Sequence, residues 1–150
     1  MSIETIIKDY VAYVLRTNAL GVLATEGNAQ PHASLVAITP MKDFANLIFA
    51  TYRNTYKYKN LINNGNVAIL FDNRNTLSKN QPDIIVLTAF GCANEIDIAD
   101  SDEFLHSHLL RHPELESFLL SSDCTLFMVK VNAYQMVSGI DNISWWHITD

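Results

Sequence analysis

Residues 20–38, LGVLATEGNAQPHASLVAI, decide the fold class of this chain. Apolar side chains alternate with polar or small ones before and after the pair Gly27 and Asn28. Alternation of this kind is typical of a half-buried strand, and a Gly-Asn pair favours a two-residue hairpin turn. The stretch therefore predicts two antiparallel strands joined at Gly27-Asn28, as the start of a β-meander.

Further strand-like segments follow along the chain, at residues 46–51, 66–71, 83–96 and 125–137, with a last apolar segment at 144–148. Gly91 interrupts a long β-branched run, which favours a bulge or bend of the kind that closes a barrel. Strands that mostly follow one another directly indicate an antiparallel barrel rather than a βαβ sheet. Because repeats and linkers are missing from the sequence, we expect one mainly β domain over residues 1–150.

Helices are expected beside this barrel. Apolar residues recur at three- and four-residue steps over residues 3–15, where Ser2 is a candidate cap, and a shorter helix is expected over residues 56–63. Asp100 and Glu103 form a candidate capping pair for a helix that reaches about Arg111, and Pro113 suits the first position of another short helix.

The composition limits the possible partners. Hydrophobic residues make up 49% of the chain and charged ones only 17%, which leaves few charges to cover a monomer and favours an oligomer. A net charge of −6 argues against binding of nucleic acid or an anionic membrane. The two cysteines share no metal-type spacing and no segment resembles a signal peptide or a membrane span, so we expect a cytoplasmic protein without a metal site.

A polar cluster before residues 56–63 is the first candidate for chemistry. Hydroxyl groups, cationic side chains and free amides at the start of a helix together suit a phosphomonoester, although an ordinary solvated loop has the same composition. The cluster consists of Thr51, Arg53, Asn54, Thr55, Lys57 and Lys59.

Two other groups have weaker signals. His108 and His112 are four residues apart, as metal ligands on a helix often are, but no acidic or cysteine partner completes the site, and with His106 they are interpreted as a solvated helix face. Trp145 and Trp146 suit either stacking on a planar ring or sealing of a core or subunit contact. Since the chain has no Gly-rich phosphate loop and no nucleophile elbow, a bound organic cofactor is the more natural source of any reactivity.

Three runs, taken in order, carry a family resemblance: residues 20–38, residues 47–74 (LIFATYRNTYKYKNLINNGNVAILFDNR) and residues 86–96 (VLTAFGCANEI). In this order the chain resembles the pyridoxamine 5′-phosphate oxidase-like proteins, the FMN-binding split barrels, over nearly its whole length. The resemblance implies a six-stranded antiparallel split β-barrel of Greek-key type with flanking helices. It also implies a homodimer in which each FMN lies in a cleft shared by the two subunits.

The resemblance further implies a set of cofactor-binding residues. Some match strand positions along the flavin and ribityl chain, others match the phosphate grip near Lys57, and a last group would reach the flavin from the partner subunit or flank it. The set is Ser34, Leu35, Val36, Ala50, Thr51, Arg53, Thr55, Tyr56, Lys57, Asn73, Arg74 and Trp146.

The chain also departs from the pattern of the true oxidases. Ser34 and Tyr56 stand where the oxidases carry arginines, and Val86 stands where they carry a glutamine. We therefore expect an FMN-dependent oxidoreductase, related to pyridoxamine 5′-phosphate oxidase, that acts on a small molecule or reductant of unknown identity. The alternatives are a non-catalytic flavin carrier or sensor, and a dimer that binds another planar ligand such as haem or a deazaflavin. The role of His32, at the start of a strand, stays open.

Overall fold

The structure is a computed structural model that describes residues 2–80 and 83–148. Its helices are α1 (Ile3–Thr17), α2 (Tyr56–Asn63), α3 (Ser101–Arg111) and α4 (Glu116–Leu119), with 3₁₀ turns η1 (Arg74–Thr76), η2 (Ile98–Asp100) and η3 (Pro113–Leu115). Its strands are β1 (Leu20–Gly27), β2 (Gln30–Ala37), β3 (Thr39–Pro40), β4 (Asn46–Tyr52), β5 (Asn66–Asp72), β6 (Ile85–Glu95), β7 (Cys124–Ser138) and β8 (Asn142–His147). Within the described ranges no helix has the length and apolar character to cross a membrane.

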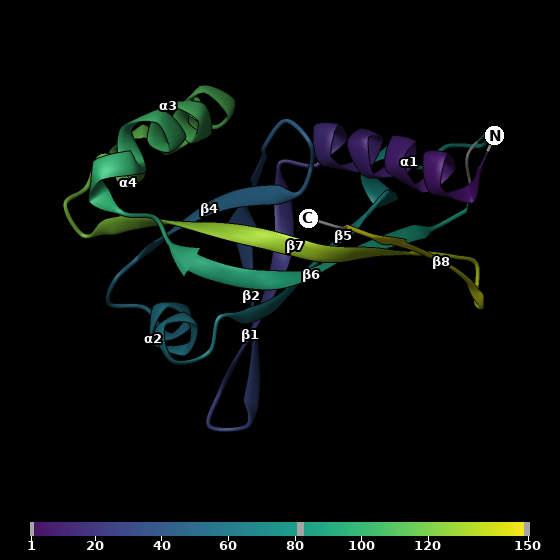
Figure 1. The fold of residues 1–150 in the computed structure, drawn as a ribbon. Coiled ribbons are helices and arrows are strands. Elements are labelled where there is room, and N and C mark those ends of the chain that lie inside the picture. Colours follow the sequence, from purple (N-terminus) through teal and green to yellow (C-terminus); the bar gives the residue numbers. More distant parts are fainter. Residues whose placement is uncertain (1, 81–82, 149–150) are drawn as a thin grey trace.

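The strands form one antiparallel sheet in the order β2-β1-β5-β6-β7-β4-β3, with β8 also paired to β7. The sheet curls until its edge strand β2 comes near β4, which leaves an open seam between these two strands (Figure 1). The expected mainly β split barrel with flanking helices is therefore confirmed. Its six expected strands are the six long ones, to which the structure adds the two-residue β3 and the C-terminal β8.

The β1–β2 hairpin is confirmed, but its turn lies one residue later than expected. Gly27 pairs with Gln30 inside the ladder, so Asn28 and Ala29 are the two turn residues. Both have positive φ, 53° and 63°, as a type I′ turn requires. The predicted Gly27-Asn28 turn is wrong because Gly27 belongs to the strand ladder. Ala29 takes the second turn position in its place and adopts the left-handed conformation.

Gly91 marks a bulge, as predicted. The register between β6 and β7 shifts between Phe90 and Gly91. A Cβ atom on Gly91 would lie 2.2 Å from the carbonyl oxygen of Lys130, so the close approach of the two strands requires glycine here.

The core lies between the concave face of the sheet and α1. Ser2 caps α1 through its Oγ, which accepts a hydrogen bond from the backbone N–H of Thr5 (3.1 Å). The apolar stripe of α1 is fully buried, and each of its large side chains contributes about 1.5–3 kcal/mol of burial free energy. The stripe consists of Ile7, Val11, Val14 and Leu15.

The segment between β6 and β7 corrects two expectations. α3 ends at Arg111 and Pro113 begins η3, both as predicted, but the side chain of Asp100 makes no capping hydrogen bond, so the Asp100–Glu103 capping pair is wrong. His108 and His112 are 0% and 1% exposed, which overturns the interpretation of a solvated helix face. His108 lies on the side of α3 that packs against β3 and β4, and His112 follows the helix as its C-cap, with Nε2 2.9 Å from the carbonyl of Ile38.

Candidate functional site

A cavity of about 250 Å³ opens at the seam between β2 and β4, where α2 and α3 also meet it. Four of the predicted cofactor-binding residues line it together: Leu35, Val36, Ala50 and Lys57. The other lining residues are Leu20, Ala37, His108, Leu115 and Phe118. The site is thus an apolar slot that contains one cationic group and one imidazole.

Lys57 supplies the positive charge of this slot. It lies in the first turn of α2, and burial lowers the pKa of its ammonium group from the usual value. Within the described ranges no carboxylate forms an ion pair with it. A partly desolvated cation without a counter-ion favours an anionic ligand, and the N–H groups of the first helical turn beside it have no intrahelical acceptor.

The hydroxyls of Thr51 and Thr55 shape the start of α2. Their Oγ atoms lie 2.8 Å apart, and Thr55 Oγ1 both donates to the carbonyl of Tyr52 (2.9 Å) and accepts from the N–H of Tyr58 (3.2 Å). Thr55 is therefore the N-cap of α2, which fixes the direction of the helix amides.

Tyr56 is the third member of the predicted phosphate grip. Its side chain is 56% exposed and packs on the imidazole of His32, with ring centroids 5.1 Å apart. The structure therefore places His32 beside the start of α2, where Nδ1 of His32 is buried without a hydrogen-bond partner. Of the triplet from Thr55 to Lys57, only Lys57 lines the seam cavity.

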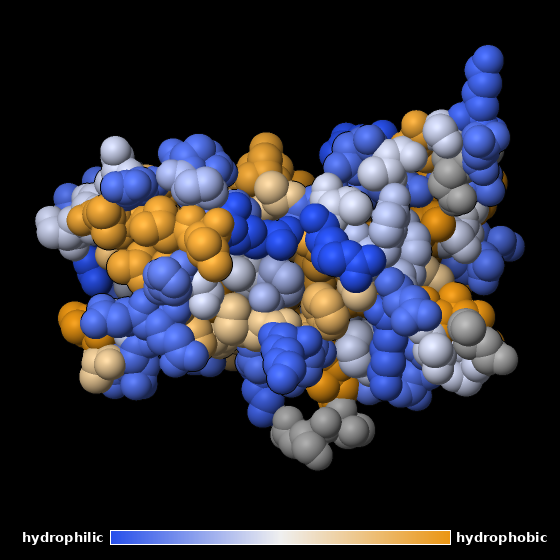
Figure 2. Space-filling view, turned by 90° about the horizontal axis from the view of Figure 1, so that it is seen from above, coloured by the Kyte–Doolittle hydropathy of each residue, from blue (hydrophilic) through white to orange (hydrophobic). Residues whose placement is uncertain are grey.

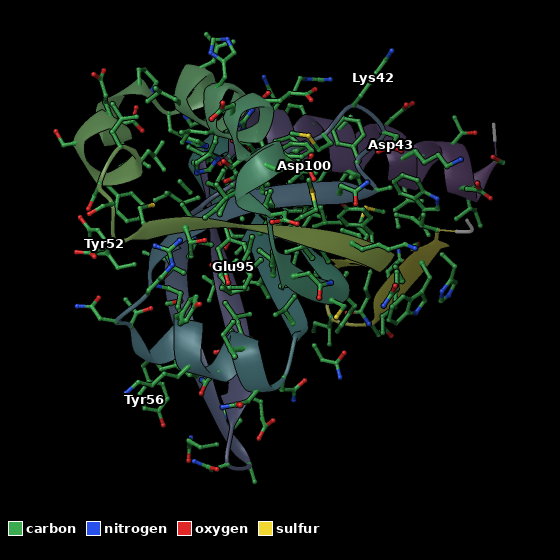
Figure 3. All side chains as sticks on the ribbon, turned by 60° about the vertical axis from the view of Figure 1, so that its left-hand side comes forward. Lys42, Asp43, Tyr52, Tyr56, Glu95 and Asp100 are labelled. Atoms are coloured by element: carbon green, nitrogen blue, oxygen red, sulfur yellow. The ribbon has the colours of Figure 1, made fainter. Side chains whose placement is uncertain are left out.

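Arg53 lines a different hollow, together with Glu95. Its guanidinium donates to the carbonyl of Ser122 (3.0 Å), and its Nε lies 3.7 Å from a carboxylate oxygen of Glu95. Figure 3 shows Glu95 apart from Tyr56, which lies at the other side of α2. The expected help of Arg53 in the phosphate grip thus has no support in this arrangement, because Arg53 is paired elsewhere.

Asn73, Arg74 and Trp146 do not meet the seam cavity within one chain. The buried amide of Asn73 donates to the carbonyl of Asp83 (3.0 Å) and accepts from the N–H of Ile85 (2.9 Å), so it fastens the loop before β6. Arg74 pairs with Asp72. Trp146 stacks on Tyr134, with centroids 5.5 Å apart. Arg74 lines a neighbouring hollow of about 200 Å³ that shares Leu20 and Leu35 with the seam cavity, whereas Asn73 and Trp146 line neither of the two.

Ser34 precedes the lining residue Leu35 on β2 and has a buried Oγ that finds no hydrogen-bond partner among the described residues. A buried hydroxyl without a partner costs free energy, so it is a candidate to bind a ligand atom at this edge. Leu35 is 68% exposed and lies at the rim of the cavity. β2 is also an edge strand, so one side of its backbone is free of the ladder.

His108 is the site residue that the sequence analysis missed. Its Nδ1 lies 2.7 Å from the hydroxyl of Thr39, while its Nε2 is buried without a partner. Burial first, and then the nearby His112 and Arg111, lowers its pKa to about 4, so the imidazole is neutral near pH 7. The signal was available, since Leu105, His108, Leu109 and His112 follow helical spacing on one apolar stripe.

A larger hollow of about 540 Å³ lies on the other side of α2, but its lining is mostly polar and includes the carboxylate of Glu26. A carboxylate there disfavours a phosphate group. The slot at the seam is therefore the better candidate.

The family model of pyridoxamine 5′-phosphate oxidase matches residues 7–118. The chain belongs to the pyridoxamine 5′-phosphate oxidase family. The matched range contains β1 to β6 and α3, and it also reaches Leu115 and Phe118, so it includes every residue that lines the seam cavity. Among curated proteins none matches the chain.

Solved structures share the fold at low sequence identity. A haem-binding protein from Mycobacterium smegmatis has a TM-score of 0.77 at 17% identity, over 91% of this chain and 56% of its own, so this chain spans little more than half of that protein. A Clostridium acetobutylicum protein related to general stress protein 26, of the pyridoxine phosphate oxidase family, has a TM-score of 0.73 at 13% identity. The match covers 97% of this chain and 97% of that protein. An FAD-binding protein from Mesorhizobium loti has a TM-score of 0.68 at 14% identity, over 86% of this chain and 92% of its own.

Proposed function

We propose that the seam cavity binds FMN and that the chain is an FMN-dependent oxidoreductase that works as a homodimer. The observation that carries this proposal is Lys57, a partly buried ammonium group in the first turn of α2 that has no counter-ion within residues 2–80 and 83–148. A phosphate held there would receive the charge of Lys57 together with the first-turn amides of α2 that Thr55 does not cap.

The rest of the slot suits a flat ring. Leu35, Val36 and Ala50 provide an apolar wall on both sides of the seam. The free backbone edge of β2 and the hydroxyl of Ser34 supply hydrogen-bonding groups beside that wall. Bound FMN would supply hydride or electron transfer, and the role of these residues is to position it and to exclude water.

The size of the cavity supports a shared site. Pockets for small molecules usually have about 300–1,000 Å³, so the slot of about 250 Å³ in one chain is too small to enclose a cofactor alone. A second copy packed over the rim at Leu35 would add the missing wall.

A row of side chains on the outer face of the sheet, apolar at both ends with Thr88 and Gln135 between them, is the proposed contact row for that second copy. Ladder pairing places Leu35 opposite Val22, Val22 opposite Leu70 and, further along, Gln135 opposite Trp145. Thr88 joins the two halves of the row, since it pairs with both Leu70 and Gln135. Leu35, Leu70 and Trp145 are 68%, 39% and 43% exposed, and the row leads directly to the cavity. Apolar side chains that line up over several strands are typical of an interaction surface.

Turnover is part of this proposal, and its alternative is a flavin carrier or sensor. Reduction of bound FMN by NADH or NADPH followed by oxygen consumption would support the oxidoreductase. A bound flavin that accepts no electrons from either would support the carrier.

Haem is a second candidate because of His108. A neutral imidazole that holds Nδ1 against a partner and keeps Nε2 free is the form in which histidine binds haem iron. The fold likeness to a haem-binding protein is consistent with it. The two ligands are easily told apart, since haem gives a Soret band and FMN gives two bands in the near-ultraviolet and blue.

The test is a titration of the purified chain with FMN, followed by fluorescence and by the absorption spectrum after desalting. We expect the flavin to be retained by the wild type and weakened ~10-fold or more by Lys57→Gln, since a charge-assisted hydrogen bond contributes about 1.5–3 kcal/mol. Lys59→Gln is the matched control because Lys59 lies on the same helix but faces the hollow beside Glu26. Equal affinities in the two variants would contradict the phosphate assignment, and no retention by the wild type would contradict FMN binding itself.

A further inference from the structure

His108 has one satisfied and one unsatisfied ring nitrogen in a position with no exposure to solvent. A buried nitrogen without a partner costs about 1–3 kcal/mol, so native structures rarely keep one without a reason. The imidazole also forms part of the wall of the seam cavity, on the α3 side.

The groups described around the ring are engaged elsewhere, and the seam cavity is the open space that the ring borders. Nδ1 is turned to Thr39 on β3. The neighbouring ring of His112, with its centroid 4.8 Å away, donates its own Nε2–H to the carbonyl of Ile38 (2.9 Å) and so is engaged. The guanidinium of Arg111 donates to the carbonyls of Leu15 and Asn18 and so is also engaged.

We propose that Nε2 of His108 hydrogen-bonds a polar atom of the bound flavin other than its phosphate, namely a ribityl hydroxyl, a ring carbonyl or a ring nitrogen. This inference rests on the proposed function, because it takes the occupant of the cavity to be FMN. His108 and Lys57 then hold different parts of one ligand from α3 and α2.

A neutral group suits this role. Either tautomer of the imidazole leaves Nε2 able to form one hydrogen bond, as donor or as acceptor according to the state of Nδ1. The phosphate is already matched by the cation of Lys57, and a neutral imidazole adds no charge to it. His108 is thus a binding contact that acts on flavin with or without its phosphate.

Riboflavin, which lacks the phosphate, separates the two roles. His108→Leu is expected to weaken the binding of FMN and of riboflavin by a similar factor, ~10-fold each. Lys57→Gln is expected to weaken FMN and to leave riboflavin within about twofold. A His108→Leu variant that weakens FMN but not riboflavin, or neither, overturns the inference.

Nitrogen NMR of the wild type, labelled with ¹⁵N-histidine, keeps the test independent of whether His108→Leu folds. The expected result is a shift of the His108 Nε2 signal on addition of riboflavin, with Nδ1 nearly unchanged, because only Nε2 gains a partner. An Nε2 signal that stays in place while riboflavin is bound overturns the inference and leaves FMN binding intact. Absence of any flavin binding by the wild type is a different result, since it overturns the proposed function and this inference with it.

Discussion

The hydroxyl of Thr39 lies 2.7 Å from Nδ1 of His108, in the core and across 69 residues of sequence. This hydrogen bond joins the short strand β3 to the helix α3 and fixes the orientation of the imidazole. The ring therefore contributes to the fold through Nδ1, while the proposed contact with a ligand in the seam cavity uses Nε2.

Acid should destabilise the fold through His108. The pKa of His108 falls from 6.5 in the unfolded chain to about 4 in the fold, chiefly through burial, so the unfolded chain binds the proton more tightly. The contribution of neutral, buried His108 to the free energy of unfolding is complete above pH 6.5, and it is lost as the pH falls toward 4. Between pH 7.5 and pH 5 we expect a loss of about 2 kcal/mol in the free energy of unfolding. Urea unfolding at both pH values measures it, and His108→Gln should remove most of the difference.

Leu35→Glu should dissociate the proposed dimer and weaken the proposed FMN binding, because it places a carboxylate on the proposed contact row and at the rim of the cavity. Light scattering with gel filtration measures the mass of the particle in solution and so distinguishes a monomer from a dimer. The control is Leu110→Glu on α3, since Leu110 is 75% exposed and Figure 2 shows apolar side chains gathered at the end of the molecule that carries α3 and α4. Dissociation by Leu110→Glu and not by Leu35→Glu would move the interface to that end.

Gly91→Ala should destabilise the chain by about 3 kcal/mol, because its Cβ would meet a backbone oxygen of β7 that cannot move alone. Gly139→Ala is the comparison, since Gly139 has φ of +67° but no atom within 4 Å of an added Cβ. Its expected cost is only about 1 kcal/mol, the strain of a left-handed alanine. Thermal unfolding of both variants measures the difference, and equal costs would show that the bulge tolerates a side chain.

Thr55→Ala should lower the free energy of unfolding by about 1 kcal/mol, because α2 loses its N-cap. Thr55→Ser should restore most of it, since serine offers the same oxygen. Denaturant unfolding without ligand measures this change. If alanine and serine behave alike, the capping hydrogen bond contributes little, and the methyl group of Thr55 would matter instead.

Local patterns predicted most of the fold. The alternation along β1 and β2, the helical spacing of α1 and the glycine at the β6 bulge all report interactions with near neighbours or with one buried face. The turn at Asn28-Ala29 differs by one residue because the register of the ladder, which the whole hairpin sets, decides which two residues turn.

The candidate site was harder to predict from the sequence, because its residues come from segments that are far apart along the chain. Lys57 was predicted from its place at a helix start, a local feature. The partner of Arg53, in contrast, is Glu95 on another strand, and only the folded chain brings the two together. His108 was assigned to solvent because histidine counts as polar, whereas its spacing with Leu105 and Leu109 places it on the buried stripe of α3.

The pairing of β7 has a consequence for biosynthesis. β4 is held in the sheet by β7 and the two-residue β3, so Ala50 and its side of the seam gain their place only after residues 124–138 have left the ribosome. β1 and β2 can pair as soon as they emerge, since their ladder is local. The seam cavity is therefore complete only once β7 has paired with β4, and a nascent chain that stops short of β7 would leave the edges of β4 and β6 open to a chaperone or to aggregation.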